Sequence, residues 1–299
     1  MEDEFSTQPP WVEIFRSDRQ AQIQDAALVL AAVEIDYRVH RPQTVPPGPW
    51  SLLVEPHNQE MGHQQLVEFW EENSKPPVKP IEVATVDTGW WGVIGFLAVI
   101  WSVPNLAQFT SVDLRDAGIL DAGLIAQGEV WRIVTALTLH ADFSHILSNT
   151  VFGSLFGLFA SRYLGSGCAW LVIVLASMAA NYTNALIHPD DFRSLGASTA
   201  SFAALGLAPT VLWRQGVFKH QDWRRALAPV FAAICMLAYM GFGGERTDVG
   251  AHVFGFGFGA LAGYFIAPLN FQAMGPALQQ KLGIAALSII LFSWSIALK

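Results

Sequence analysis

The chain has 299 residues, of which 52% are hydrophobic and only 14% are charged, and its formal net charge at pH 7 is −8. This composition argues against an ordinary soluble enzyme and favours a membrane protein. The acidic balance argues against nucleic-acid binding, which needs a basic surface.

The first 74 residues predict a small soluble domain. Residues 11–16 read as a strand, residues 18–36 as a helix capped by Asp18, and two more strands flank the Pro-rich turn at 42–49 before a second helix over 58–74. This order predicts an α+β domain of ferredoxin-like type at 1–74, followed by a linker at 75–88. The acidic N-terminus has no apolar stretch, so no cleavable signal peptide is expected.

Uncharged apolar segments of about membrane-spanning length follow the linker. They lie near residues 89–109, 145–161, 166–187, 196–213, 226–244, 249–268 and 282–298. Because the second and the last are short, the pattern favours seven spans and leaves six as the alternative.

Lys and Arg placement predicts the orientation of these spans. The loop 214–225 carries Arg214, Lys219, Arg224 and Arg225, and the basic residues at 75, 79, 162 and 281 fall on the same side of the membrane. We therefore expect the N-terminal domain to be cytoplasmic.

Four polar residues open three spans that run in the same direction. Ser198 starts the fourth span, His252 lies near the start of the sixth, and the second opens with His145 and Asn149. They share one depth near the outer face, where a serine beside a histidine is a potential nucleophile with its base. No Asp or Glu lies inside a span, so the pattern predicts a dyad; Asp248, in the loop before His252, is left as a residue able to orient it.

The surroundings of this pair suit acyl transfer. His145 and Asn149 share a helix face and, with the Ser198 backbone N–H, form a candidate oxyanion hole. Gly255, Gly259 and Gly263 form a small-residue stripe that lets a neighbouring helix approach closely; in the fourth span the matching small residues are Ala200, Ala203, Ala204 and Gly206.

Each of these features alone has a structural explanation. A serine in a small-residue span more often packs than reacts, and a histidine at a span end often lies at the interface. His140 and His145 are five apart, a poor spacing for a metal on one helix face, and no carboxylate or thiol cluster completes a site. We expect neither a metal nor a cofactor.

Three stretches taken in order resemble the rhomboid intramembrane serine proteases. They are EVWRIVTALTLHADFSHILSN (129–149), GAST (196–199) and AHVFGFGFG (251–259). The resemblance implies an all-α membrane protein with a six-helix core at 89–270 and a seventh, C-terminal transmembrane helix at 271–299.

The family pattern also implies residue roles. Ser198 would be the nucleophile, His252 the general base, and His145 and Asn149 would line the oxyanion hole. The supporting positions that match are Gly196, Phe202, which would pack on the catalytic histidine, Gly255, Gly259, and Trp131 with Arg132, which would shape the first external loop.

Thr199 departs from this pattern, because the family has glycine after the serine. A β-branched side chain there is expected to narrow the space beside the nucleophile and to crowd the oxyanion pocket. We interpret it as a modulator of rate or specificity.

The sequence thus predicts an intramembrane serine endopeptidase that cleaves single-span membrane proteins near the extracytoplasmic face through an acyl-enzyme. The expected location is the lipid bilayer of a bacterial cytoplasmic (inner) membrane. A catalytically silent rhomboid-like protein that binds membrane clients is the first alternative. A channel or transporter with His145 and His252 as a proton relay is the second, disfavoured because the spans lack carboxylates and an evident inverted repeat. The substrate and the oligomeric state stay open.

Overall fold

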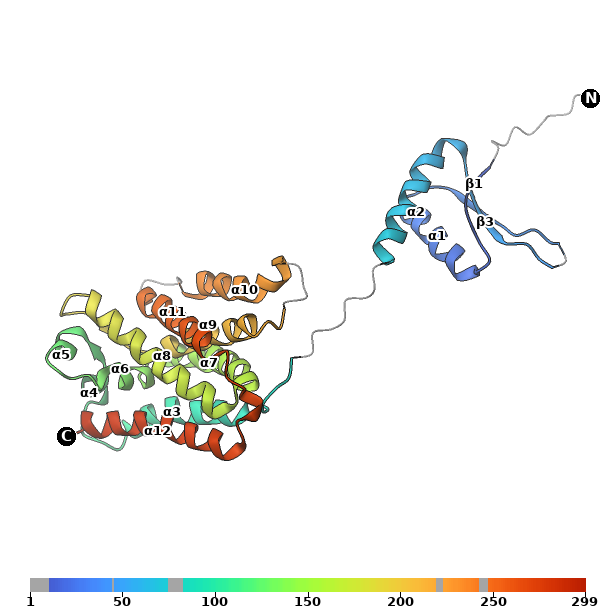
Figure 1. The fold of residues 1–299 in the computed structure, drawn as a ribbon. Coiled ribbons are helices and arrows are strands. Elements are labelled where there is room, and N and C mark those ends of the chain that lie inside the picture. The colour runs from blue at the N-terminus through green and yellow to red at the C-terminus, as the bar shows by residue number, and fades with distance from the viewer. Residues whose placement is uncertain (1–10, 45, 75–82, 219–222, 242–246) are drawn as a thin grey trace, which may run out of the picture. The chain divides into compact units, whose positions relative to one another are not determined.

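The computed structural model describes residues 11–44, 46–74, 83–218, 223–241 and 247–299. They belong to two compact units, Met1–Pro80 and Ile81–Lys299 (Figure 1). Each unit is described by itself.

The N-terminal unit is a three-stranded antiparallel sheet with two helices. Its elements are β1 (Val12–Ser17), α1 (Gln20–Ala32), β2 (Tyr37–His40), β3 (Trp50–Val54), the 3-10 turn η1 (Pro56–Asn58) and α2 (Gln59–Asn73). The strand order is β1-β3-β2, and a core that includes Ile23, Leu30, Leu52 and Leu66 lies between the sheet and the helices. The predicted Asp18 cap is wrong, because the N-cap of α1 is Arg19 and no side chain caps the helix.

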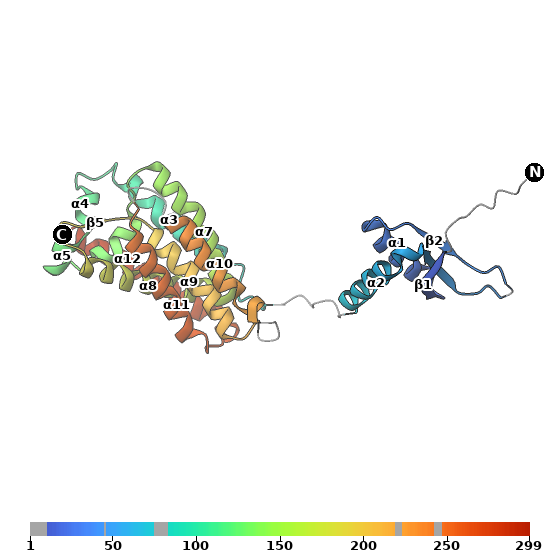
Figure 2. The ribbon, with the colours of Figure 1, turned by 90° about the horizontal axis from the view of Figure 1, so that it is seen from above.

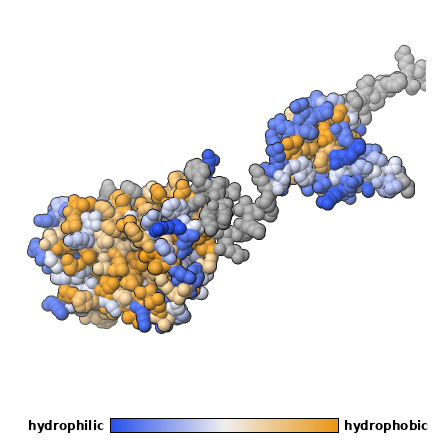
Figure 3. Space-filling model, viewed as in Figure 1, coloured by the Kyte–Doolittle hydropathy of each residue, from blue (hydrophilic) through white to orange (hydrophobic). Residues whose placement is uncertain are grey.

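Seven long helices of the C-terminal unit, within the part of the chain that the structure describes, lie over the seven predicted apolar segments (Figures 1 and 2). They are α3 (Trp90–Leu106), α7 (Phe143–Leu164), α8 (Ser166–Ile187), α9 (Ser198–Arg214), α10 (Trp223–Gly241), α11 (Val249–Ile266) and α12 (Pro276–Ala297). Of these, α7, α8, α11 and α12 are long and apolar enough to cross a membrane, while α3 and the Leu227–Tyr239 part of α10 are shorter apolar helices. Apolar side chains cover much of the visible face of this unit (Figure 3).

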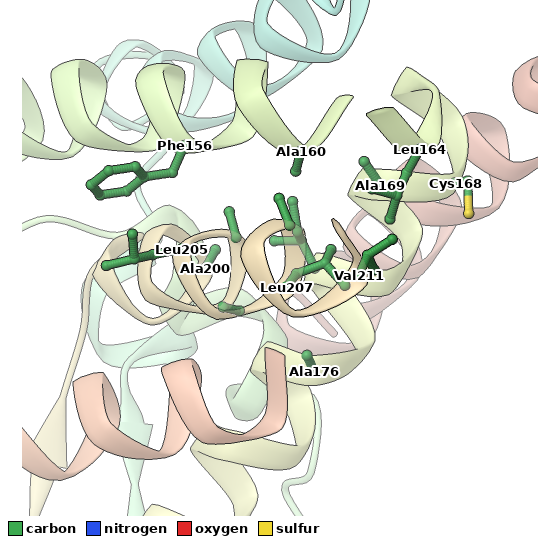
Figure 4. Close-up of a cluster of buried hydrophobic side chains, with 14 of the residues drawn as sticks. Phe156, Ala160, Leu164, Cys168, Ala169, Ala176, Ala200, Leu205, Leu207 and Val211 are labelled. Carbon is green, nitrogen blue, oxygen red and sulfur yellow. The ribbon is translucent and has the colours of Figure 1, made fainter. Parts of the chain in front are cut away.

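Helix α9 lies at the centre of the helical unit. Every residue from Thr199 to Pro209 is buried, because α7, α8, α10 and α11 all pack against it. Figure 4 shows Ala200, Leu205, Leu207 and Val211 of α9 with Phe156 and Ala160 of α7 facing them. A helix enclosed by protein needs small, closely packing side chains more than lipid-soluble ones.

Short elements fill the connection between α3 and α7. They are α4 (Leu114–Gly118), β4 (Leu120–Asp121), α5 (Ala122–Ala126), α6 (Arg132–Thr135) and the 3-10 turn η2 (Ala136–Thr138). β4 pairs antiparallel with β5 (Arg193–Ser194), which lies just before α9. The Asp121 carboxylate accepts a hydrogen bond from Arg193 Nε at 2.8 Å, so this connection is fastened to the segment that leads into Ser198. A 3-10 turn, η3 (Phe271–Ala273), joins α11 to α12.

Candidate active site

The turn that leads into α9 depends on Gly196. Its φ of +136° is a conformation that other residues rarely adopt, and its N–H donates to the Ala136 carbonyl at 2.9 Å. A Cβ atom here would lie 2.8 Å from His145 Nε2 and 3.5 Å from Ser198 Oγ. Gly196 therefore lies between the imidazole of His145 and the hydroxyl of Ser198, and no larger residue fits.

Helices α9 and α11 run parallel with almost no space between their backbones. Cβ atoms at Gly255 and Gly263 would lie 2.6 Å from the Thr199 and Leu207 carbonyl oxygens, and one at Gly259 would overlap the Ala203 carbonyl. The glycine stripe of α11 thus contacts successive turns of α9, which brings the first turns of the two helices to one level.

His252 lies in the first turn of α11 and faces α9. The residue is 7% exposed, and its ring lies 4.4 Å from the Phe202 ring, centroid to centroid, at an angle of 35°. Phe202 follows Ser198 by one helical turn, so the ring contact keeps the imidazole at the level where α9 begins.

Asp248 fixes the start of α11. One of its carboxylate oxygens accepts from the Ala251 N–H at 2.9 Å, and the other accepts from Asn184 Nδ2 of α8 at 2.8 Å. The carboxylate that the sequence offered as a possible orienter of His252 therefore caps the helix that carries this histidine.

His145 and Asn149 lie on α7, whose first turn is capped by Asp142 Oδ1 accepting from the His145 N–H at 2.8 Å. His145 meets Gly196, and two turns further along α7 a Cβ at Gly153 would lie 3.0 Å from Ser201 Oγ. Asn149 falls between these two contacts, so its side chain is level with the first turn of α9.

The Asn149 amide is one of the buried polar groups around this site that lack a hydrogen-bond partner in the part of the chain that the structure describes, with His140 Nδ1 and Asn184 Oδ1. Asn149 is 5% exposed, yet its Nδ2 has no hydrogen-bond acceptor among the described residues. A buried donor without a partner is rare and needs an explanation. This one lies on α7 between His145, which meets Gly196, and Gly153, which meets Ser201.

His140 is a neighbour that the sequence analysis did not place in the site. The Ala197 N–H donates to its Nε2 at 3.5 Å, and its ring lies 5.2 Å from that of His145, centroid to centroid. Burial, and to a lesser degree the nearby His145, lowers the pKa of His140 to about 4. The imidazole is therefore neutral at pH 7 and is fixed beside the residue that precedes Ser198.

Thr199 contacts both α8 and α11. Its hydroxyl donates to Asn181 Oδ1 of α8 at 3.1 Å, and its methyl group lies against Gly255 of α11. These contacts are with α8 and α11, whereas His145 and Asn149 lie on α7. Crowding of the oxyanion pocket by Thr199 stays a prediction.

Asn181 and Asn184 are polar residues that the sequence analysis missed. Both are buried within α8, and their amides bind the α9 and α11 sides of the site. The signal was present in the stretch NYTN, since amides inside a span need partners as ionisable groups do.

Trp131 and Arg132 lie in the connection between α3 and α7, apart from the candidate site residues on α7, α9 and α11. Arg132 is 5% exposed; its guanidinium pairs with Glu129 at 2.7 Å and donates to the carbonyls of Asp116 and Ile119. Trp131 is half-buried beside it. The pair holds the connection between α3 and α7 in shape. No group of three or more His, Cys, Asp or Glu residues able to hold a metal occurs within the described ranges.

Comparison with known proteins gives one consistent result. The family model described as the rhomboid domain matches residues 127–269. The Bacillus subtilis protein YdcA, whose name assigns it provisionally to the rhomboid proteases, is 28% identical over 164 residues, which is 54% of this chain and 80% of YdcA. RHOMBOID-like protein 5 of Arabidopsis thaliana is 28% identical over 154 residues, 51% of this chain and 48% of that protein.

A second Bacillus subtilis protein, the rhomboid protease GluP, is 28% identical over 151 residues, 50% of this chain and 28% of GluP. The chain thus spans half or less of the length of two of these three relatives. The matched region contains the residues gathered at the start of α7, α9 and α11.

Proposed function

The chain belongs to the rhomboid family and is a multi-pass integral membrane protein, and on this premise we propose that it is an intramembrane serine protease. Ser198 is the nucleophile and His252 the general base. Asn149, His145 and the Ser198 backbone N–H bind the oxyanion. The proposed chemistry needs only these groups and water.

The observation that carries the proposal is the buried Nδ2 of Asn149, which has no hydrogen-bond acceptor among the described residues and lies on α7 level with the first turn of α9. A packing serine in a small-residue helix does not require a free hydrogen-bond donor beside it. An oxyanion hole does, because its donor acts on a charge that exists only during the reaction. The neutral His140 and the fixed turn at Gly196 support the same reading, since both hold the start of α9 in place.

The reaction follows from these positions. Ser198 Oγ attacks the scissile carbonyl carbon while His252 accepts the hydroxyl proton, and the oxyanion accepts hydrogen bonds from Asn149 and its neighbours. Collapse of the tetrahedral intermediate breaks the peptide bond, and His252 returns the proton to the leaving amine. A water molecule, deprotonated by His252, then hydrolyses the acyl-enzyme and frees Ser198.

Substrate and orientation are part of the same proposal. The substrates are single-span membrane proteins that enter from the bilayer. The basic loop around Arg214 supports a cytoplasmic N-terminal unit, and with this orientation the site would open toward the extracytoplasmic face.

A fluorophosphonate probe tests the proposal, because it labels an activated serine and needs no known substrate. We expect labelling of the detergent-solubilised wild type and none of Ser198→Ala or His252→Ala. Cleavage of a single-span model substrate in proteoliposomes should be lost in the same two variants. If folded wild type neither labels nor cleaves, the alternative of a catalytically silent client-binding protein takes its place.

A further inference from the structure

A buried hydrogen-bonded chain begins at the residue after the nucleophile. Thr199 Oγ1 donates to Asn181 Oδ1 at 3.1 Å, and Asn181 Nδ2 donates to the Ile133 carbonyl at 2.8 Å. Thr199 and Asn181 are each 3% exposed. These two hydrogen bonds therefore link α9 to α8 and α8 to α6. Helix α6 directly follows Trp131 in the connection between α3 and α7.

The chemistry of the partners fixes the orientation of the Asn181 side-chain amide. Ile133 offers only a carbonyl acceptor, so the Asn181 amide must turn its NH₂ group toward Ile133 and its oxygen toward α9. That oxygen needs a donor, which the Thr199 hydroxyl supplies. A glycine or valine at position 199 would leave a buried amide oxygen unpaired, which is destabilising.

The other atoms of Thr199 contact α11. A Cβ atom at Gly255 would lie 2.6 Å from the Thr199 carbonyl oxygen and 3.3 Å from its Cγ2 methyl. Gly255 follows His252 by one turn of α11. A single side chain thus binds α8 through its hydroxyl and packs on α11 through its methyl group, a combination that only threonine provides.

The backbone at this position does not require glycine. Gly196 has a positive φ. Thr199 is not among the described residues with a positive φ, as expected for a residue inside a helix. The Cβ of Thr199 is therefore accommodated without backbone strain.

We propose that Thr199 is a positioning residue that, through Asn181 and Gly255, sets the rotation of the first turn of α9 and so the placement of the Ser198 hydroxyl relative to His252. The inference rests on the proposed function. Adjacent residues of a helix are rigidly related, so fixing Thr199 on two sides fixes Ser198. Thr199 and Asn181 act as a pair, and neither touches the substrate.

The test compares four variants with wild type: Thr199→Val, Thr199→Ser, Asn181→Leu and the double variant Thr199→Val/Asn181→Leu. Each is measured for kcat and KM on a single-span model substrate in proteoliposomes, for the rate of fluorophosphonate labelling of Ser198, and for thermal unfolding. Thr210→Val is the matched control, because Thr210 is also a threonine of α9 but its hydroxyl donates to the Gly206 carbonyl of its own helix.

We expect Thr199→Val to lower kcat and the labelling rate about tenfold, the effect of roughly 1.4 kcal/mol, with KM unchanged. Thr199→Ser should restore most of the rate, since it keeps the hydroxyl. Asn181→Leu should resemble Thr199→Val, and the double variant should be no slower than either single one. Thr210→Val should retain the wild-type kcat.

Two outcomes separate this inference from the proposed function. If wild type labels and cleaves while Thr199→Val matches it, or if Thr199→Ser is as slow as Thr199→Val, the positioning role is overturned and the protease reading stands. The positioning role is also overturned if Thr199→Val loses activity only in proportion to its loss of folded protein. If wild type neither labels nor cleaves, the proposed function itself fails.

Discussion

Asn149 Nδ2 is one of several buried donors that have no hydrogen-bond partner among the described residues, and it is the one that lies on the face of α7 next to the start of α9. In a folded protein such a group is a liability, since a hydrogen bond to water has been lost and not replaced. It is useful only if an acceptor arrives during function. The activity and the stability of the protein should therefore respond in different ways when this amide is removed.

We expect Asn149→Ala to lower kcat about 100-fold, the usual effect of losing one oxyanion donor. Thermal stability should change little. Because Nδ2 has no hydrogen-bond acceptor among the described residues, its removal leaves no acceptor unpaired. Substrate cleavage and thermal unfolding measured on one preparation check both halves. A large fall in Tm with the rate per folded molecule unchanged would contradict this role.

His140 makes stability depend on pH. Its pKa in the folded protein is about 4, against an ordinary value of 6.5, so the unfolded chain takes up a proton that the folded state resists. The contribution of neutral His140 to the free energy of unfolding is complete above pH 6.5, and it is lost as the pH falls from 6.5 toward 4. We expect Tm in detergent to fall over this range, and His140→Gln to flatten the fall. If Tm falls with pH equally steeply in wild type and His140→Gln, groups other than His140 cause the pH dependence of stability.

At the scale of elements, the contact between α9 and α11 assembles the site. Its closeness comes from glycines whose missing side chains let carbonyl oxygens approach. Alanine at these positions would push the two helices apart, and Ser198 and His252 lie on opposite sides of that contact.

Gly259→Ala should lower both stability and activity, because its Cβ would overlap the backbone carbonyl of Ala203. We expect destabilisation of about 1–3 kcal/mol and a labelling rate at Ser198 lower by about 100-fold. Gly257→Ala is the control: nothing lies within 4 Å of a Cβ there, and alanine favours a helix over glycine. Equal effects of the two substitutions on thermal unfolding and labelling would refute the packing argument.

Hydropathy located the long helices well and their polar ends less well. The predicted span 166–187 coincides with α8, whereas α12 begins at Pro276 and not near 282. The first turns of α12 are polar because Gln279 binds the start of α8, accepting from the Cys168 N–H and donating to the Leu164 carbonyl. A hydropathy average cannot register a polar side chain with a buried partner.

For the candidate site, the sequence could indicate some residues but not the contacts that hold them. Ser198, His252, His145 and Asn149 could be proposed from the sequence because their spacing and shared depth depend only on helix order. The partner of Thr199 could not, since nothing in the sequence tells which face of α8 meets α9. The sequence analysis also missed the short elements α4 to α6 and β4. Segments of a few residues, held by side-chain contacts such as those of Arg132, show no periodicity in the sequence.

At the scale of the whole molecule, the chain separates into two units between Pro80 and Ile81. Each has its own hydrophobic core, and every residue proposed for the reaction lies in the second. The N-terminal unit is therefore not required for the chemistry itself.

We expect residues 81–299, produced alone, to label with the fluorophosphonate probe at the wild-type rate. Comparison with full-length protein in the same detergent checks this, with Ser198→Ala in each form as the blank. Loss of labelling in a shortened protein that still unfolds cooperatively would assign the N-terminal unit a part in catalysis.

The caps of the three parallel helices have an electrostatic consequence. α7 and α11 begin with the carboxylates of Asp142 and Asp248, which offset the positive ends of those helix dipoles. α9 begins at Ala197 with no side-chain cap, so the partial positive charge of its first N–H groups is left uncompensated beside Ser198. A full negative charge gains more from that field than a neutral carbonyl does. In the proposed reaction this field would favour the tetrahedral intermediate over the bound peptide, and such a preference for the charged state is what accelerates a reaction.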